Sequence, residues 1–154
     1  MAGLIFRFPK DSDWPHILRL ANESVRHLPC VSDQSAWLAN RREFPSERCR
    51  EHFVAVEDGR IAGYAAMEEL PGDSLRFRLF VVTSPSARGH LGEILTQRLL
   101  VRLKACAAAE AHFLEYAEDE GFIAFLEARG FHRTREISIG NDLRGVVLTR
   151  WPPF

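Results

Sequence analysis

One segment constrains the fold of this chain more than any other. It runs LFVVTSPSARGHLGEILTQRLL from Leu79 to Leu100, so a strand-like apolar stretch meets a short basic, glycine-containing loop and then an amphipathic helix pattern. The first turn of a helix has backbone N–H groups without intrahelical partners and carries partial positive charge. Glycine lets the backbone approach a phosphate closely, and an arginine adds a fixed charge with several donors. The segment therefore predicts a pyrophosphate cradle, formed by Arg88, Gly89, His90, Leu91 and Gly92.

Composition limits the classes of protein to which this chain can belong. The 154 residues are 46% hydrophobic and 27% charged with a net charge of −1, which is typical of one soluble domain over residues 1–154. The balance of charge gives no basic field for nucleic acid or an anionic membrane. The beginning of the sequence lacks a signal-peptide pattern, and no apolar stretch approaches transmembrane length. We expect a cytoplasmic protein with no nucleic-acid or membrane partner.

The cysteines give no indication of a metal site. There are three of them, Cys30, Cys49 and Cys106, and neither their spacing nor that of the histidines matches a zinc motif. Reduced thiols are the natural expectation for a cytosolic chain, and no metal is predicted.

Apolar periodicity and turn signals divide the chain into short elements. Asp58-Gly59 between two alternating runs is a strong hairpin signal, and Pro71-Gly72-Asp73 marks another turn. Gly130 is expected at the C′ position of a helix. Strands are predicted at residues 4–8, 51–57, 61–69, 75–83, 112–117, 131–139 and 143–151, and helices at 15–25 and at about 35–44, 92–110 and 121–129.

This order of elements predicts an α/β fold of the α+β type. A mixed central sheet of about seven strands is expected, flanked on both faces by about four helices. Its N-terminal half is antiparallel, and the helix at 92–110 crosses over to a parallel strand. No internal repeat, low-complexity run or linker interrupts the pattern.

The same order, with the phosphate cradle after the central strand, resembles the GNAT family of acyl-CoA N-acyltransferases over nearly the whole chain. Each piece that carries the resemblance is weak alone, but together they stand in the family's order and near its spacing. The pieces are Phe6-Arg7 through Asp13 with Ile17, Leu20 and Asn22; the hairpin Glu57 to Tyr64; the loop Pro85 to Gly92; and Phe125 to Phe131.

The resemblance implies acetyl-CoA as cosubstrate and assigns residues to it. Backbone groups of Val81, Val82 and Thr83 would pair with the pantetheine arm, provided that their strand separates from the parallel strand at 112–117. Residues 88–92 would hold the pyrophosphate. Asp119 falls where the family often has an asparagine that contacts the arm, and Phe122 and Phe125 would lie along the cofactor's path.

The sequence departs from the family pattern at three places. The loop is one residue shorter than the family's Arg-Gly-x-Gly-x-Gly, and Asp119 puts an acceptor-only carboxylate where an amide is common. Leu126 replaces the tyrosine that protonates the leaving thiolate in many members. Leucine cannot donate a proton, so the acid must come from elsewhere or be dispensable.

Acetyl transfer to an amine requires that the amine and the thioester be held together, that N–H groups polarise the thioester carbonyl, and that a base remove a proton from the amine. Strand alternation lets only one of Glu68 and Glu69 face the substrate, and the sequence leaves open which one does. Glu68, Glu69 and Glu115 are the carboxylates available as base, and Glu69 and Glu115 are taken as the candidates. Tyr116 is the candidate acid, although an ordinary core tyrosine or a site with no dedicated acid fits the same pattern.

The leading hypothesis is therefore an acetyl-CoA-dependent N-acetyltransferase that acts on a primary amine of a small molecule or peptide. The alternative is a catalytically weak, GNAT-like module that binds CoA or acyl-CoA as a sensor or interaction partner, and a domain that binds no CoA is a third reading. The acceptor and the acyl chain length are not determined by the sequence. A homodimer is compatible with the strand edges and with the apolar end Trp151-Pro152-Pro153-Phe154.

Overall fold

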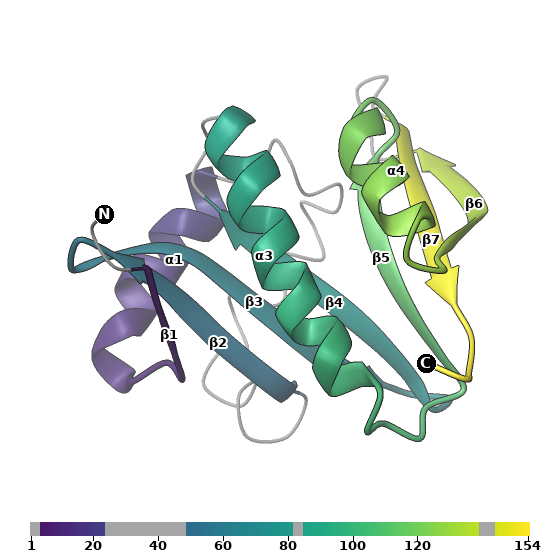
Figure 1. Cartoon of the computed structure of the whole chain (residues 1–154), viewed down its shortest axis with the longest axis horizontal. Helices are drawn as coiled ribbons and strands as arrows, with labels where there is room; N and C mark the ends of the chain where they lie inside the picture. The colour runs from purple at the N-terminus through teal and green to yellow at the C-terminus, as the bar shows by residue number, and fades with distance from the viewer. Residues whose placement is uncertain (1–3, 24–48, 82–84, 139–143) are drawn as a thin grey trace.

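The elements follow the predicted order. The computed structural model describes residues 4–23, 49–81, 85–138 and 144–154, with labels as in Figure 1. The elements are β1 Leu4–Arg7, the 3-10 helix η1 Asp11–Asp13, α1 Trp14–Glu23, β2 Cys49–Glu57, β3 Arg60–Leu70, β4 Ser74–Val81, α3 Pro85–Leu103, β5 Glu110–Tyr116, α4 Glu120–Glu127, β6 His132–Ser138 and β7 Arg144–Arg150. The helix predicted at about 35–44 lies outside the described residues.

The predicted mixed sheet is confirmed. Its seven strands run in the order β1-β2-β3-β4-β5-β7-β6, and only β4 and β5 pair in parallel. Helices α3 and α4 lie on one face, and α1 packs against β3 and β4 on the other (Figure 1). The three α-helices of the described ranges thus cover both faces, as an α/β arrangement requires.

The hairpin between β2 and β3 turns where the sequence predicts. Asp58 and Gly59 have φ values of 52° and 75°, in the left-handed region that a two-residue turn of this type demands. Glu57 pairs with Arg60 directly after the turn. An Asp-Gly pair is well suited to these angles, so this local signal sets the pairing next to the turn. An irregularity between Ala55 and Val56 then shifts the register of the residues beyond it.

Helix α3 begins and ends earlier than predicted. It starts at Pro85 rather than Gly92, because proline fits the first helical position, where its missing N–H would have no partner. The segment 88–92 is therefore not a loop before the helix but lies within its first turns. Alanine-rich residues 104–109 leave the helix, since the Ala109 N–H donates to the carbonyl of Asp73 at 2.8 Å and draws the chain to the β3–β4 turn.

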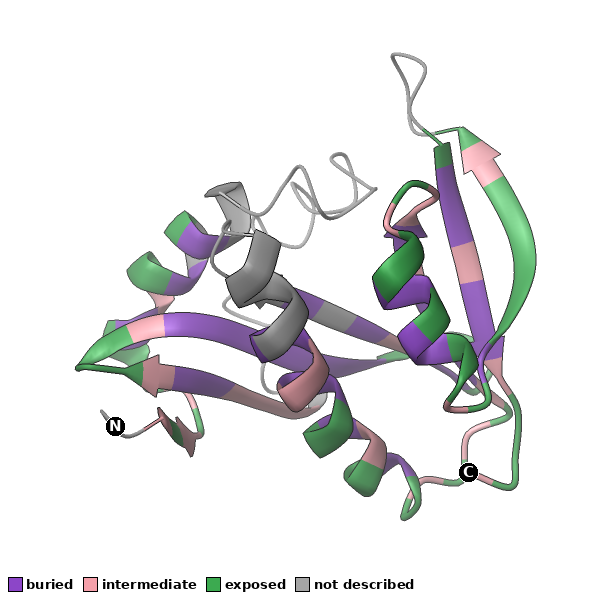
Figure 2. Cartoon of the chain, turned by 45° about the horizontal axis from the view of Figure 1, so that its top comes forward, coloured by how far each residue is buried: buried purple, intermediate pink, exposed green. Residues whose placement is uncertain are grey.

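The main core lies between the sheet and the two helices α3 and α4. Leucines at 95, 99 and 103 on α3 meet Met67 of β3 and the β4 residues Leu75 and Leu79, and all of these are buried. Burying such a side chain contributes about 1.5–3 kcal/mol each. Figure 2 shows the buried residues following the central strands beneath the helices.

Helix α4 ends in a Schellman motif. The N–H of Phe131 donates to the carbonyl of Leu126, and the N–H of Gly130 donates to that of Glu127, each at 3.2 Å. Gly130 has φ +90°, so its prediction as the C′ residue is confirmed. Leu126 and Phe131 are both buried in the core, which supplies the hydrophobic contact typical of this motif.

Replacing Gly130 tests the helix end. Gly130→Ala should lower the free energy of unfolding by about 1–2 kcal/mol, because an L-residue is strained at this φ, and because its Cβ would lie 3.3 Å from Nε of Arg150. Gly121→Ala, on the same helix with no atom within 4 Å of its Cβ, is the matched control and should be neutral or slightly stabilising. Urea denaturation of the three proteins measures both effects, and equal losses in the two variants would contradict the assignment.

Candidate active site

The site begins where two parallel strands stop pairing. The β4–β5 ladder holds three residue pairs and ends at Arg76 opposite His112. Beyond this point β4 continues to Val81 beside β3, and β5 continues to Tyr116 beside β7. The facing edges of these two stretches have no ladder partner within the described residues. Their N–H and C=O groups can therefore pair with an extended, amide-bearing ligand.

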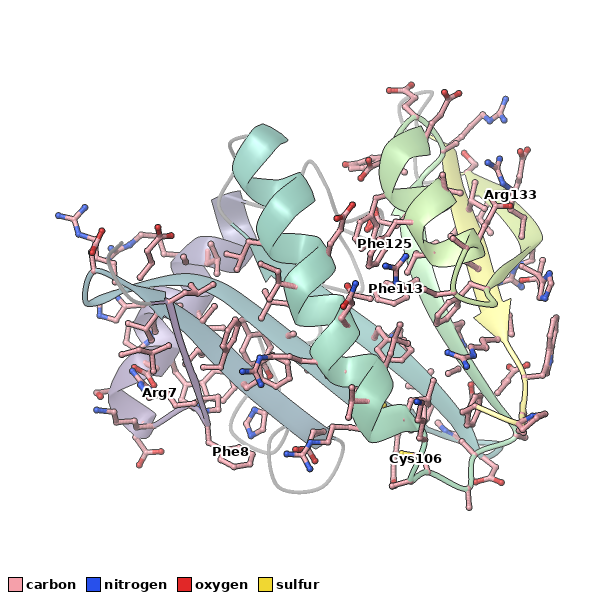
Figure 3. All side chains as sticks on the ribbon, in the orientation of Figure 1. Arg7, Phe8, Cys106, Phe113, Phe125 and Arg133 are labelled. Carbon is pink, nitrogen blue, oxygen red and sulfur yellow. The ribbon has the colours of Figure 1, made fainter. Side chains whose placement is uncertain are left out.

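Aromatic side chains fill the closed end of this opening. Phe77 and Phe113, the first residues after the last pair, stack with ring centroids 4.7 Å apart and planes at 8°. Phe122 and Phe131 meet Phe113 edge-on at 5.9 and 5.7 Å. In Figure 3, Phe113 and Phe125 lie between α3 and α4. The opening is thus closed by a rigid ring cluster on the face of the sheet that carries these helices.

The N-terminus of α3 lies at the open end, because only residues 82–84 separate β4 from this helix. Its first turns supply N–H groups and partial positive charge for an anion. Gly92 is buried, and a Cβ there would lie 3.4 Å from Leu79 and 3.7 Å from Phe122. Glycine thus allows α3 to approach both β4 and α4 closely. Leu91 beside it is buried in the core.

Several predicted cofactor residues cannot be placed in full. Val82 and Thr83 lie outside the described residues, and for Arg88, Gly89 and His90 only the helical backbone is described. Val81 is the last residue of β4, opposite Gly63.

The α4 candidates are described in full. Asp119 immediately precedes α4. Phe122 and Phe125 stack on each other at 5.6 Å and are largely buried, so they form part of the core as well as the flank of the opening. Leu126, at the family's tyrosine position, is fully buried in the same core.

The structure places Glu115 and Tyr116 together at the end of β5 but on opposite faces. Glu115 is fully buried on the face that carries α4, with Phe113. Tyr116 is partly exposed on the other face. Burial, and then the charges of Glu115 and Glu118, raise the pKa of Tyr116 above 10.0. Its hydroxyl therefore keeps its proton at neutral pH.

The two glutamates of β3 also point to opposite faces. Glu68 is buried and pairs with Arg76, whose Nη2 lies 3.1 Å from its Oε2, on the face that carries α1. Glu69 is exposed near the β3–β4 turn, opposite Leu75. Since Leu75 is opposite Ala111, Tyr116 lies five residues, roughly 17 Å, further along the strand direction than Glu69, which is also two strands away. The candidate base Glu69 is therefore not brought together with Tyr116.

A histidine–tyrosine pair on the α1 face was not singled out in the sequence. The Tyr64 hydroxyl is 3.3 Å from Nδ1 of His52, and Trp14 stacks on the same imidazole with centroids 6.2 Å apart. Tyr64 is fully buried, and burial lowers the pKa of His52 below 6.5. The strand alternation places each residue on a face, but their contact depends on the cross-strand register of β2 and β3, which no local motif indicates.

Two negative findings concern the described ranges. No group of three or more His, Cys, Asp and Glu side chains is arranged there to hold a metal ion. No helix in that part of the chain combines the length and apolar composition needed to cross a membrane.

Comparison with known families agrees with this architecture. The sequence matches the profile of the acetyltransferase (GNAT) family over residues 14–131. The chain belongs to the GNAT acetyltransferase family. No curated protein matches the sequence.

Solved structures share the fold at low sequence identity. A candidate phosphinothricin N-acetyltransferase has a TM-score of 0.77 and 14% identity, covering 97% of this chain and 98% of its own. A candidate acetyltransferase from Salmonella typhimurium, solved with its cofactor acetyl-CoA, has a TM-score of 0.72 and 18% identity over 97% and 94%. A ribosomal-protein-alanine N-acetyltransferase from Brucella melitensis has a TM-score of 0.72 and 20% identity over 96% and 99%.

Two half-buried histidines, His52 and His112, make the stability of the fold depend on pH. Burial lowers the pKa of His52 and of His112 below 6.5, so the unfolded chain takes up protons first as the pH falls. The contribution of the two neutral imidazoles to the free energy of unfolding is fully present above pH 6.5. It is lost as the pH falls from 6.5 through the lowered pKa values of the folded protein. Asp13, whose pKa is lowered by its hydrogen bond with Arg7, acts at a lower pH, below 3.8.

We therefore expect the free energy of unfolding to fall between about pH 7.5 and 5, as measured by urea denaturation at several pH values. The double variant His52→Gln, His112→Gln should show a flatter dependence over this window. His16→Gln, at an exposed position on α1, is the control. An unchanged slope in the double variant would show that other groups govern the dependence.

Proposed function

We propose that this GNAT protein transfers the acetyl group of acetyl-CoA to a primary amine of a small molecule or peptide, by direct attack in a ternary complex. The separation of β4 from β5 after Arg76 and His112 carries the proposal. It leaves two unpaired strand edges below the N-terminus of α3, which suits a ligand with an amide-bearing arm and a pyrophosphate. The bound acetyl-CoA of the Salmonella structure supports the same cosubstrate.

The reaction needs no covalent enzyme intermediate. The lone pair of the neutral amine attacks the thioester carbonyl carbon, the C–S bond breaks, and the thiolate leaves and takes up a proton. Unpaired N–H groups on the edge of β4 would polarise the carbonyl as negative charge develops on its oxygen. Holding the amine and thioester together supplies much of the rate gain.

Three side chains are proposed for the proton transfers. Tyr116 is the proposed acid that protonates the thiolate, supported by its position at the end of β5 beside the opening. The candidate bases, which accept the proton of the amine, are Glu115 and Glu69. Position along the strands favours Glu115, which lies on the stretch of β5 that no longer pairs with β4, whereas Glu69 lies opposite Leu75, where β4 and β5 are still paired. For the pyrophosphate, Arg88 and the backbone of residues 89–92 are proposed, with Asp119 and the rings of Phe122 and Phe125 beside the arm.

Loss of the proposed phosphate contact should weaken cosubstrate binding. In a calorimetric titration with acetyl-CoA, Arg88→Ala should raise Kd by about tenfold, the scale of one charge-assisted hydrogen bond. Arg102→Ala is the matched control, because Arg102 lies near the other end of α3, where its Nε is 3.6 Å from Glu51. Its Kd should equal that of the wild type. No binding by the wild-type protein would overturn the proposed function.

Removing the phenol hydroxyl tests the acid. Tyr116→Phe should lower kcat by about a hundredfold, the usual scale of general acid catalysis, and leave the acetyl-CoA Kd unchanged. The assay follows thiol release with a panel of amines. An unchanged kcat would mean that the thiolate leaves without a dedicated acid.

Two companion variants distinguish the bases. The variant that removes the true base, Glu115→Gln or Glu69→Gln, should abolish the low-pH limb of the kcat/KM profile, and the other should retain it. Circular dichroism and thermal unfolding show whether Glu115→Gln still folds, because Glu115 is fully buried.

The alternative function, a CoA-binding module with little catalysis, is favoured by one observation. Leu126 stands at the family's tyrosine position and is fully buried, so α4 offers no proton donor there. This alternative predicts tight acetyl-CoA binding without turnover of any amine in the panel. Calorimetric binding of acetyl-CoA and the thiol-release assay, taken together, therefore distinguish the enzyme from the binding module.

A further inference from the structure

The face of the sheet opposite α4 carries a groove with no assigned role. A cavity of about 470 Å³ lies over β5, β7 and β6, and we call it the open-face groove. Leu114, Val147 and Thr149 lie in it, on the strand face opposite that of the core residues Phe113, Val146 and Leu148. Its volume falls within the usual range of small-molecule pockets.

The groove has an apolar body. Leu114 and Val147 form its floor side by side, because they are paired across β5 and β7, and Ile137 of β6 flanks them. Trp151 forms one wall. It is 47% exposed, and its ring is stacked on His132 with centroids 5.9 Å apart, which holds the indole in place. These side chains suit a branched aliphatic or aromatic group of a few carbon atoms.

Two arginines and one glutamate line the groove. Arg135 lines it and has no ion-pair partner within the described residues. Arg76 also lines it and is held by Glu68 on its other side. Glu110 is the acidic group in the lining, with Ser74 Oγ 3.5 Å from its Oε1. The unpaired guanidinium of Arg135 is therefore suited to a carboxylate, which it can bind through two parallel hydrogen bonds.

The groove leads toward the proposed acid. Tyr116 shares the face of Leu114, two residues further along β5. It is paired with Gly145 of β7, and Gly145 is paired with Ile137 of the groove. Ile137, Gly145 and Tyr116 thus lie side by side across three strands, and glycine places no side chain between the other two. Arg135, Val147 and Leu114 form the neighbouring cross-strand set on the same face. Arg135 and Tyr116 are therefore offset by about one two-residue repeat along the strands.

We propose that the open-face groove binds the acceptor, and that the acceptor is an amino acid with an apolar side chain. The carboxylate would bind Arg135, the side chain would pack on Leu114, Val147 and Trp151, and the α-amine would lie toward Tyr116. The assignment rests on the proposed function, because the amine has meaning only as an acetyl acceptor. It adds the acceptor's chemical class and a residue, Arg135, that selects it.

Three probes with the same apolar body separate the contributions of the groove. L-Leucine carries the carboxylate, leucinamide replaces it with a neutral amide, and 3-methylbutylamine lacks it. With acetyl-CoA, we expect leucine to be acetylated with a kcat/KM about tenfold or more above either analogue, the loss being mostly in KM. Equal or better turnover of the two analogues would overturn the proposal.

A matched pair of variants tests the role of Arg135. Arg135→Gln should lower kcat/KM for leucine to the level of leucinamide and leave leucinamide itself unchanged. Arg133→Gln is the control on the same strand: Arg133 is paired with Leu148 of the core face, and its Nε lies 3.5 Å from Glu127 of α4 (Figure 3). Arg133→Gln should leave kcat/KM unchanged for both leucine and leucinamide. An equal loss in the two variants would overturn the assignment of Arg135.

Direct binding distinguishes failure of this inference from failure of the proposed function. Acetyl-CoA binding by calorimetry tests the function, and ligand-detected NMR of leucine with wild-type and Arg135→Gln protein tests the groove. We expect the NMR signal of leucine binding to be lost in Arg135→Gln, whether or not the wild-type protein acetylates leucine. No leucine binding at millimolar concentration would overturn the inference alone. So would a dimer in sedimentation that Val147→Arg dissociates, because the groove would then be an interface between two copies.

Discussion

The short ladder between β4 and β5 decides what the rest of the molecule can do. Three residue pairs hold the strands together, and beyond Arg76 and His112 each strand relies on its other neighbour. A buried backbone group without a partner costs about 1–3 kcal/mol. Such an edge is tolerated where solvent or a ligand can pair with it. The stack of Phe77 on Phe113 fills the closed end at about the spacing of neighbouring strands, so the separation begins from a fixed, packed point.

The sheet also keeps two environments apart, because successive residues of a strand face opposite sides. Along β5, Phe113 and Glu115 lie on the covered side with α4, whereas His112, Leu114 and Tyr116 lie on the open side. A thioester held between the two strand edges would be accessible from both. The covered side then suits the long cosubstrate, and the open side suits a small acceptor that must enter and leave.

Much of the fold was predictable, because the signals that define it are local. The Asp58-Gly59 turn and Gly130 at the end of α4 each depend on a backbone angle that few residues accept, and both were predicted correctly. The predicted start of α3 was wrong. Glycines at 89 and 92 indicate a loop by composition, but the helix begins at Pro85, and Gly92 lies inside it, where it packs on Leu79 and Phe122.

The candidate site was less predictable, since alternation shows that Glu68 and Glu69 differ in face but not which face each takes. That choice depends on the packing of α1 and α3 on the sheet. The contact of His52 with Tyr64 likewise depends on the register between strands, which no local signal in the chain specifies.

The packing of α4 bears on where a proton donor can be expected. On α4, Phe122, Ile123, Phe125 and Leu126 are all buried, and the helix is short. A phenol in place of Leu126 would have to satisfy its hydroxyl inside this core, because an unpaired buried hydroxyl costs about 1–3 kcal/mol. Leucine removes that requirement and lets α4 pack as a purely apolar helix. A donor for the thiolate is then expected from the strand beside the opening rather than from α4. On β5 the phenol of Tyr116 stands at the border between burial and solvent, where its apolar ring packs and its hydroxyl keeps its proton at neutral pH.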